Sequence, residues 1–258
     1  MTLDPSAVLL TDRVAVVTGA AVGIGEAIAL TFARFGAHVA ICDRDVEHLD
    51  DTADGIEAAG RRVVAGELDV RDEEACRDFV YTVTEELGPV DILVNNAGGG
   101  FFADFVEVNA KGQDALVREN FGSVTNFVRP VVDAMAEQGG SIVNLTSIEA
   151  HRAAPGYAVY SAMKAAVTSL TASLALELGP RMIRVNCIAP DVIPTPGVGP
   201  VGVHTPLPVP GDVDDVAGCA VFLASDLSRF VTGTTIHVDG GNWAAGGWRR
   251  MPDGTFKP

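Results

Sequence analysis

The chain has 258 residues, 48% of them hydrophobic and 20% charged, which allows one large domain or two small ones and argues against a largely disordered chain. Its 34 acidic and 18 basic side chains give a formal net charge of −16, and this field repels a phosphate backbone, so we expect no nucleic-acid partner. The start lacks the basic segment of a secretory signal, and no uncharged apolar run approaches the roughly 18 residues of a membrane span, so we expect a cytoplasmic protein with no membrane partner. Neither the cysteines nor the histidines show ligand spacing, so we expect reduced thiols and no metal.

Short β-branched runs alternate with longer amphipathic stretches along the chain. We expect strands at Arg13–Thr18, His38–Cys42, Arg62–Glu67, Asp91–Val94, Ser141–Thr146, Ile183–Ile188 and Thr234–Val238. Helices are expected at Ile24–Phe35, Asp45–Ala59, Asp72–Leu87, roughly Asp104–Glu137, Ala158–Leu178 and Asp212–Ser225. Most strands are nearly continuous in apolar residues, which is typical of parallel strands covered on both faces. The pattern predicts an α/β fold with an open, doubly wound sheet of about seven mostly parallel strands flanked by helices.

No segment between residues 13 and 240 has the composition of an interdomain linker, so we expect one domain over residues 1–258 with a core at about 11–242. The Pro/Gly-dense segment Pro190–Gly211 follows the sixth expected strand. A loop of this length inside a domain is typically functional, and we expect it to act as a substrate lid. The tail 243–258 holds Trp243 and Trp248, which predicts that it docks onto a surface such as a neighbouring subunit.

The first expected strand runs into a glycine-rich turn, Thr18-Gly19-Ala20-Ala21-Val22-Gly23-Ile24-Gly25. Glycines allow a tight turn, close approach of a pyrophosphate to the backbone, and close packing of the helix on the sheet. The N–H groups at the start of the helix then face the phosphates. An empty strand-to-helix turn is the alternative that the motif alone leaves open.

An acidic residue, Asp43, closes the second expected strand. A carboxylate at this place can accept hydrogen bonds from both adenosine ribose hydroxyls, as in NAD-binding proteins, and it repels a 2′-phosphate. The neighbouring Arg44 is the counter-argument, because a guanidinium can bind that phosphate. We therefore expect NAD rather than NADP, while a solvated residue or a helix cap remains the structural alternative for Asp43.

A tyrosine and a lysine, Tyr160 and Lys164, lie four residues apart on an expected helix and so share one face. A nearby ammonium favours the phenolate form of a phenol whose ordinary pKa is about 10, so Tyr160 could exchange a proton with an alcohol or ketone. Ser147, at the end of the fifth expected strand, could hold the substrate oxygen, and Asn120 could kink its helix or anchor a water in a proton relay. An aromatic ring packed beside a solvated lysine is the bland alternative.

Together these motifs resemble the short-chain dehydrogenase/reductase family of the classical type over about residues 11 to 242. Three further matches are Asp69-Val70, Asn95-Asn96-Ala97-Gly98 and Asp239-Gly240-Gly241. The resemblance is to 3-oxoacyl-[acyl-carrier-protein] reductases and hydroxysteroid dehydrogenases among others. It implies a Rossmann fold with strand order 3-2-1-4-5-6-7, a homotetramer or homodimer joined through the long helices, and a catalytic tetrad of Asn120, Ser147, Tyr160 and Lys164. It also implies that the cofactor contacts Gly19, Val22, Gly23, Ile24, Gly25, Asp43, Arg44, Asp69, Val70, Asn95, Ala97, Gly98, Tyr160, Lys164, Pro190, Ile193 and Thr195.

Two features depart from the family pattern. Asp191 follows Pro190 where glycine is usual, and the segment from Thr195 to Asp212 is shorter than usual. We expect Glu149 and Tyr157 to face the substrate, and Phe101, Phe102 and the apolar lid suggest that the substrate is hydrophobic, such as a 3-oxoacyl or 3-hydroxyacyl thioester or a steroid-like ring alcohol. The predicted function is hydride transfer between NAD(H) and a secondary alcohol or ketone; the alternative is a catalytically weak or inactive cofactor-binding regulator or scaffold of the same fold.

Overall fold

Seven parallel strands form the central sheet of the computed structural model, which describes residues 4–199, 202–203 and 205–257. The strands are β1 Val14–Thr18, β2 His38–Asp43, β3 Val63–Glu67, β4 Ile92–Asn95, β5 Gly140–Leu145, β6 Ile183–Pro190 and β7 Thr235–Val238. Their spatial order is β3-β2-β1-β4-β5-β6-β7, and every pairing between neighbours is parallel. The predicted doubly wound α/β fold and its strand order are therefore confirmed.

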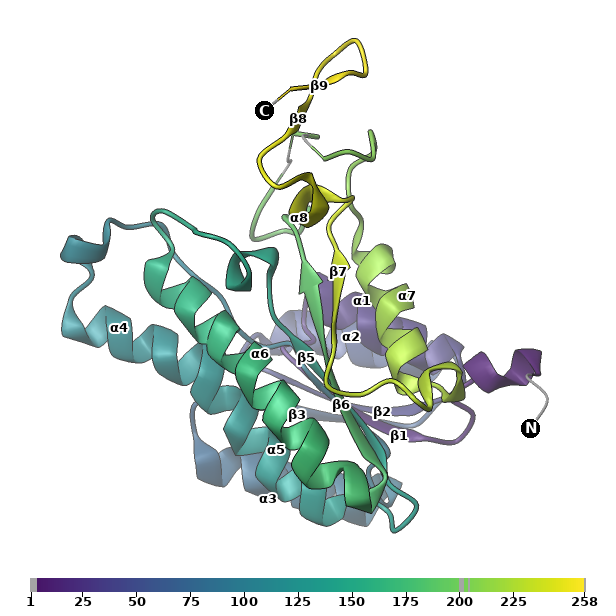
Figure 1. Cartoon of the computed structure of the whole chain (residues 1–258). Coiled ribbons are helices and arrows are strands. Elements are labelled where there is room, and N and C mark those ends of the chain that lie inside the picture. Colours follow the sequence, from purple (N-terminus) through teal and green to yellow (C-terminus); the bar gives the residue numbers. More distant parts are fainter. Residues whose placement is uncertain (1–3, 200–201, 204, 258) are drawn as a thin grey trace.

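Helices cover both faces of this sheet (Figure 1). One face carries α1 Ile24–Arg34, α2 Val46–Ala58 and α7 Val213–Ala224, and the other carries α3 Glu73–Leu87, α5 Ser123–Ala134 and α6 Ala158–Leu178. Shorter elements are α4 Ala110–Val117, α8 Asn242–Ala245, a π-helical turn at Arg118–Gly122 and single turns at Pro5–Val8, Phe105–Glu107, Ile148–Ala150, Gly179–Arg181 and Asp226–Ser228.

The apolar strands supply two separate cores because successive side chains of a strand point to opposite faces. In β1, Ala15 and Val17 belong to the core beneath α1, α2 and α7, whereas Val14 and Val16 belong to the core beneath α3, α5 and α6. All five residues of the strand are buried. A strand between two helix layers has no solvent face, which explains the nearly continuous apolar runs in the sequence.

The single helix expected at Asp104–Glu137 is wrong in its first part. Residues 105–107 form only one turn, and α4 begins at Ala110 after Asn109, whose side-chain oxygen accepts a hydrogen bond from the N–H of Gly112 at 2.9 Å. Such a side-chain cap favours a helix start at this position. A π-helical turn centred on Asn120 then separates α4 from α5, in agreement with the kink expected there.

The chain after β7 rises beyond the carboxyl ends of the strands, beside the expected lid segment (Figure 1). It forms α8 and then a short antiparallel hairpin, β8 Arg249–Arg250 with β9 Phe256–Lys257, which the sequence analysis did not predict. The Leu207 N–H donates to the carbonyl of Gly240 at 3.0 Å. The lid and the tail of one chain therefore pack together; residues 200, 201 and 204 of the lid lie outside the described residues.

Among the described residues, one helical stretch, Ala158–Arg181, is long and apolar enough to cross a membrane by length and composition alone. In this fold the same stretch contains α6, which packs along β6 and contributes Val167 and Ala175 to the second core. A helix that packs on a core can satisfy the same criteria as a membrane span, although only 22% of this stretch is buried in the single chain.

Candidate active site

The turn between β1 and α1 has a shape that only glycine can adopt. Gly19 and Gly23 have φ values of +66° and +70°, in the left-handed region that other residues avoid. A Cβ atom on Gly25 would overlap the carbonyl oxygen of Gly19. Gly23 is also the N-cap of α1, so the free N–H groups at the start of that helix lie at the turn.

A cavity of about 320 Å³ lies beside this turn, at the carboxyl ends of β1, β2 and β4. Open α/β sheets bind their ligands at this end of the strands. The expected cofactor residues that line it are Gly19, Val22, Gly23, Ile24, Asp43, Arg44, Val70, Ala97, Gly98 and Thr195. Its lining also includes Leu68, Asn96, Glu119 and Gly197, which the sequence analysis did not select. A glycine cradle, a helix N-terminus and a carboxylate in one cavity fit a nicotinamide dinucleotide.

The Asp43 carboxylate is held at the edge of this cavity by backbone N–H groups. One oxygen accepts from Arg44 at 2.7 Å, and the other accepts from Ala21 in the glycine turn at 3.2 Å. The side-chain cap of α2 is Asp45, not Asp43, so the helix-cap alternative for Asp43 is excluded. The guanidinium of Arg44 lies 3.5 Å from the carboxylate of Glu119.

Besides Tyr160 and Lys164, which belong to the group of polar side chains described below, the structure does not bring five expected cofactor residues to the lining of this cavity. Asn95 points into the protein, where its Nδ2 donates to Asn144 Oδ1 at 2.8 Å, and the next residue, Asn96, faces the cavity and holds the carbonyl of Gly19. The reason is the alternation of the strand, because Asn95 is the last residue of β4 and its neighbour points the other way. Pro190 is the buried end of β6, Ile193 is buried in the first core, and Gly25 lies beneath the turn.

Asp69, the fifth of these residues, binds a neighbouring guanidinium. Both of its carboxylate oxygens accept hydrogen bonds from Arg71, at 2.5 to 3.0 Å. The Arg71 guanidinium lowers the pKa of Asp69 to about 2. The carboxylate is therefore ionised and fixed beside Val70, which does line the cavity.

Three polar side chains border the backbone from Gly98 to Gly100, which follows β4, and a fourth lies beside one of them. Asn120 is fully buried, and its amide exchanges two hydrogen bonds with the backbone of Gly99, at 2.8 and 3.1 Å. A Cβ atom on Gly98 would lie 3.1 Å from the Nζ of Lys164, and one on Gly100 would lie 3.1 Å from the Tyr160 ring. The fourth side chain, Ser147, lies near enough to Tyr160 to lower the pKa of its phenol.

The electrostatics of this group differ from the expectation that Lys164 makes Tyr160 more acidic. Burial raises the pKa of Tyr160, and the neighbouring Ser147 hydroxyl only partly opposes this. Burial also lowers the pKa of Lys164 to about 8. The Nζ atom of Lys164 lies 5.7 Å from the centre of the Tyr160 ring. In the chain without cofactor, desolvation therefore outweighs the attraction between the two groups.

The two residues expected to face the substrate have different surroundings. Tyr157 packs edge-to-face against Tyr160 and Phe102, with ring centres 6.3 and 5.7 Å apart, and forms an apolar wall beside Tyr160. Glu149 is paired with Arg152 at 2.8 Å, and its N–H donates to the Ser147 hydroxyl at 3.1 Å. The Tyr157 ring is free to contact an apolar substrate, whereas the Glu149 carboxylate already has a partner, Arg152, within the protein.

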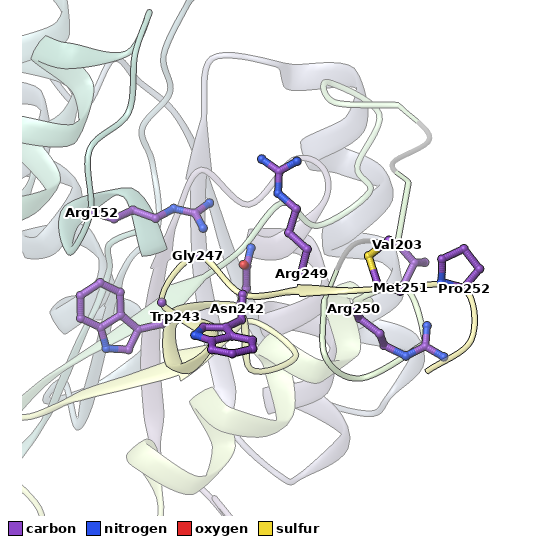
Figure 2. Close-up of a pocket in the computed structure, with 11 residues that line it drawn as sticks. Arg152, Val203, Asn242, Trp243, Gly247, Arg249, Arg250, Met251 and Pro252 are labelled. Carbon is purple, nitrogen blue, oxygen red and sulfur yellow. The ribbon is translucent and has the colours of Figure 1, made fainter. Parts of the chain in front are cut away.

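The unusual Asp191 is engaged on both sides rather than directed at the cofactor cavity. One carboxylate oxygen accepts from Asn242 Nδ2 at 2.7 Å, and the other lies 3.7 Å from Arg152. Asn242 and Arg152 both line the cleft that the C-terminal tail forms, and Figure 2 shows Arg152 at the left of the view and Asn242 near its middle. Asp191 thus connects the start of the lid to the tail.

Two histidines near the lid form an aromatic cluster with Trp243. The rings of His151 and His237 lie 4.6 Å apart, and His237 stacks on Trp243 at 5.7 Å with 7° between the planes. The Nε2 atoms of both histidines are buried without a partner among the described residues. Burial, and then the neighbouring His237, lower the pKa of His151. His151 packs against His237 and Trp243, and it is not part of the group of four polar residues around Tyr160.

Comparison with known proteins agrees with this geometry. A family model described as enoyl-(acyl carrier protein) reductase matches residues 19–242. The chain is 38% identical over 241 residues to the 3-oxoacyl-[acyl-carrier-protein] reductase of Thermotoga maritima, with 90% of this chain and 98% of that protein covered. It is 36% identical over 248 residues to the gluconate 5-dehydrogenase of Gluconobacter oxydans, with coverages of 92% and 97%.

A solved structure of 7α-hydroxysteroid dehydrogenase, complexed with NADH and 7-oxo glycochenodeoxycholic acid, has the same fold. It superposes with a TM-score of 0.89 at 32% identity and covers 93% of this chain and 98% of its own. The range matched by the family model begins in the glycine turn and includes Asn120, Ser147, Tyr160 and Lys164. The chain therefore belongs to the short-chain dehydrogenase/reductase family of oxidoreductases, which use a nicotinamide cofactor.

Proposed function

We propose that the protein is an NAD(H)-dependent oxidoreductase that interconverts a hydrophobic secondary alcohol and its ketone. The observation that carries the proposal is the placement of three side chains around Gly98 to Gly100, next to the cavity of the glycine turn, with Ser147 beside one of them, Tyr160; the other two are Asn120 and Lys164. When a hydride is added to or removed from the substrate carbon, a proton must enter or leave the oxygen bonded to that carbon, and these side chains supply the groups for the proton step. When bound, the nicotinamide ring supplies or accepts the hydride.

The protein's own groups divide the remaining work. Tyr160 donates its proton to the ketone oxygen in reduction, and burial favours this protonated form. Ser147 holds the same oxygen by a hydrogen bond. Lys164 supplies a positive charge that favours the phenolate during oxidation, and the resemblance to the family gives it a second contact, with the nicotinamide ribose. Asn120 holds the backbone of Gly99 and so positions the floor of the site.

The same proposal assigns the cofactor to the cavity beside the glycine turn. The N–H groups at the start of α1 bind the pyrophosphate, and Val70 packs on the adenine. Asp43 binds the adenosine ribose, and its carboxylate repels a 2′-phosphate, so we favour NAD over NADP. Glu119 supports this preference, because it pairs with the one arginine, Arg44, that lines this cavity within the described residues.

The substrate is hydrophobic in this proposal because an apolar wall borders Tyr160. Phe101 and Tyr157 line it, and Phe102 packs edge-to-face on Tyr157. The relatives are named for a thioester, a sugar acid and a bile-acid derivative, so their names support an alcohol or ketone carbon and do not choose one molecule.

We also propose a cytoplasmic homotetramer or homodimer. The face of α6 away from the sheet supports this assembly: Ala162, Ala172 and Leu176 are exposed on it, and Leu176 has 79% of its surface accessible. Covering such a face would remove apolar surface from water. The alternative of an inactive regulator of the same fold is not favoured, because the four polar residues are present and the named relatives are enzymes.

A panel of secondary alcohols and ketones, assayed by nicotinamide absorbance with NAD and NADP in parallel, tests the proposal. We expect turnover of apolar members, with a higher kcat/KM for NAD(H) than for NADP(H). Inertness toward the whole panel, together with tight NADH binding, would support the regulator instead. A preference for NADPH would contradict the role of Asp43 and leave the chemistry of Tyr160 in place.

A further inference from the structure

A cleft of about 860 Å³ lies between the C-terminal tail and the segment that follows Ser147 (Figure 2). Three arginines line it, Arg152, Arg249 and Arg250, and the described lining residues include no carboxylate. The chain as a whole has a formal charge of −16, so this gathering of cationic groups runs against its composition. Oxyanions are the ligands that arginine forks bind best, often through two parallel hydrogen bonds.

The hairpin of the tail concentrates the charge further. In the β8–β9 register Arg249 lies opposite Lys257, and two like charges directly across a strand pair repel each other. Within the described part of the chain, neither Arg249 nor Arg250 forms an ion pair with a carboxylate. The hairpin's own acid, Asp253, accepts two hydrogen bonds from Thr255 in the turn. An anion held between these side chains would offset the repulsion.

A chain of contacts connects the cleft to the proposed catalytic residues. Arg152 pairs with Glu149, and the Glu149 N–H donates to the hydroxyl of Ser147. At the other side Asn242, which also lines the cleft, donates to Asp191. One wall of the cleft, at Arg152, is therefore linked to Ser147 through a single intervening residue, Glu149.

Both tryptophans of the chain, Trp243 and Trp248, line the same cleft and are about half exposed, at 44% and 53%. Indole faces pack well against apolar groups. Arg249 points up and Arg250 down and away from Asn242 in Figure 2, so the arginines reach the rim of the cleft on two sides. The lining combines apolar walls with cationic ends, which suits a ligand that has an apolar stem and an anionic terminus.

We propose that this cleft binds an anionic end of the substrate, a carboxylate or a phosphate ester, while the alcohol or ketone carbon lies at Tyr160. The inference rests on the proposed function for the position of the reacting carbon. It narrows the substrate class from hydrophobic alcohols and ketones to those that carry an oxyanion beyond an apolar stem. Arg249 and Arg250 are the specificity-determining residues, and Arg152 is shared between the anion and Glu149.

Tryptophan fluorescence tests occupancy directly, because both indoles of the protein border the cleft. Hexanoate and hexyl phosphate are the probes, and hexanol is the neutral control. We expect saturable changes with one or both anions and none with hexanol, and at least a tenfold loss of affinity in the variant Arg249→Ala/Arg250→Ala. The matched control Arg77→Ala/Arg129→Ala removes the same charge from α3 and α5 and should bind as the wild type does. An equal response to hexanol, or unchanged affinity in the tail variant, would overturn the proposal.

The kinetic arm compares 7-oxooctanoate with its methyl ester. We expect at least a tenfold higher kcat/KM for the acid, expressed mainly in KM, and loss of this preference in the tail variant with turnover of the ester unchanged. The variant Arg249→Lys/Arg250→Lys keeps both positive charges without the guanidinium forks, and its preference for the acid should fall between those of the wild type and of Arg249→Ala/Arg250→Ala. Equal use of acid and ester by the wild type would refute the anion site and leave the proposed oxidoreductase standing, whereas anion binding by fluorescence without turnover of either ketone would refute the proposed function alone. Thermal unfolding and NADH binding verify that each variant is folded.

Discussion

The ammonium of Lys164 donates a hydrogen bond of 2.9 Å to the carbonyl of Leu145, the last residue of β5. Lys164 is 4% exposed, and among the described residues its ammonium has no carboxylate partner. A buried cation held by one carbonyl is costly for the folded state. Leu145 is two residues before Ser147, and the Nζ atom of Lys164 lies 5.7 Å from the centre of the Tyr160 ring. The free-energy cost of burying the ammonium therefore follows from the proposed chemistry, which needs the charge at this place.

Replacement of Lys164 by methionine is expected to change how stability depends on pH. The pKa of Lys164 is about 8 in the folded chain, against about 10.4 for an unfolded lysine. Between these values the unfolded chain binds the extra proton, so the contribution of Lys164 to stability rises with pH and is smallest below about pH 8. The free energy of unfolding of the wild type, minus that of Lys164→Met, should increase by about 2 kcal/mol from about pH 7.5 to about pH 9.5.

Urea unfolding at the two pH values measures this difference, in which the other titrating groups cancel. The exposed Lys111 provides the control, since Lys111→Met should give a difference that does not change with pH. A flat difference for Lys164→Met would mean that the ammonium is solvated in the folded protein.

Loss of the phenol hydroxyl tests the proton step. Tyr160→Phe should bind NADH as the wild type does and lose turnover by about a thousandfold or more, because general acid–base groups contribute on the order of 10²–10⁴. Burial raises the pKa of Tyr160, so alcohol oxidation, which needs the phenolate, should speed up as pH rises above neutral, and this rise should vanish in the variant. Stopped-flow binding and pH–rate profiles are the measurements. The neighbouring Tyr157→Phe, expected to keep turnover within a few-fold, separates loss of the proton from loss of a ring contact.

Much of the fold was predictable because parallel strands between helix layers leave a plain sequence signal. The start of α6 at Ala158 and its end at Leu178 agree with the prediction, and the seven strands differ by two residues or fewer at each end. The failure at 104–109 has a local cause: Phe105 and Val106 are apolar but exposed, and the Asn109 cap begins the helix later. The tail hairpin was missed because two-residue strands with arginine and lysine carry no alternating apolar pattern.

The sequence predicts a site residue well where the shape of the backbone requires one residue type. It predicts poorly where the direction of a side chain decides which residue faces the cavity. Gly19 and Gly23 could be selected because their turn needs left-handed residues. Asn95 and Asn96 are adjacent and chemically identical, so only the alternation at the end of β4 decides which one faces the cavity. The links from Asp191 to Asn242 and Arg152 join segments about fifty and about forty residues apart, which no local pattern reveals.

Removal of the Asp43 carboxylate should weaken the preference for NAD. In Asp43→Ser the like charge that opposes a 2′-phosphate is gone, and Arg44 at the cavity edge can exchange its pairing with Glu119 for one with that phosphate. We expect the ratio of kcat/KM for NADPH over NADH to rise about tenfold or more, which corresponds to about 1.4 kcal/mol. Addition of Arg44→Ala should cancel the gain. An unchanged ratio in Asp43→Ser would place the source of cofactor choice elsewhere in the cavity.

A charge on the outer face of α6 should dissociate the proposed oligomer. Leu176 is 79% exposed in the single chain, and burying its side chain against a partner contributes about 2 kcal/mol per subunit. Leu176→Glu replaces that gain with the desolvation of a carboxylate, so sedimentation should show a smaller species at micromolar concentration. Val106→Glu is the control, because Val106 is 89% exposed on the loop before α4 and lies off this face. If Leu176→Glu sediments with the wild type while Val106→Glu dissociates, subunits associate through the loop before α4 and α6 remains exposed to water.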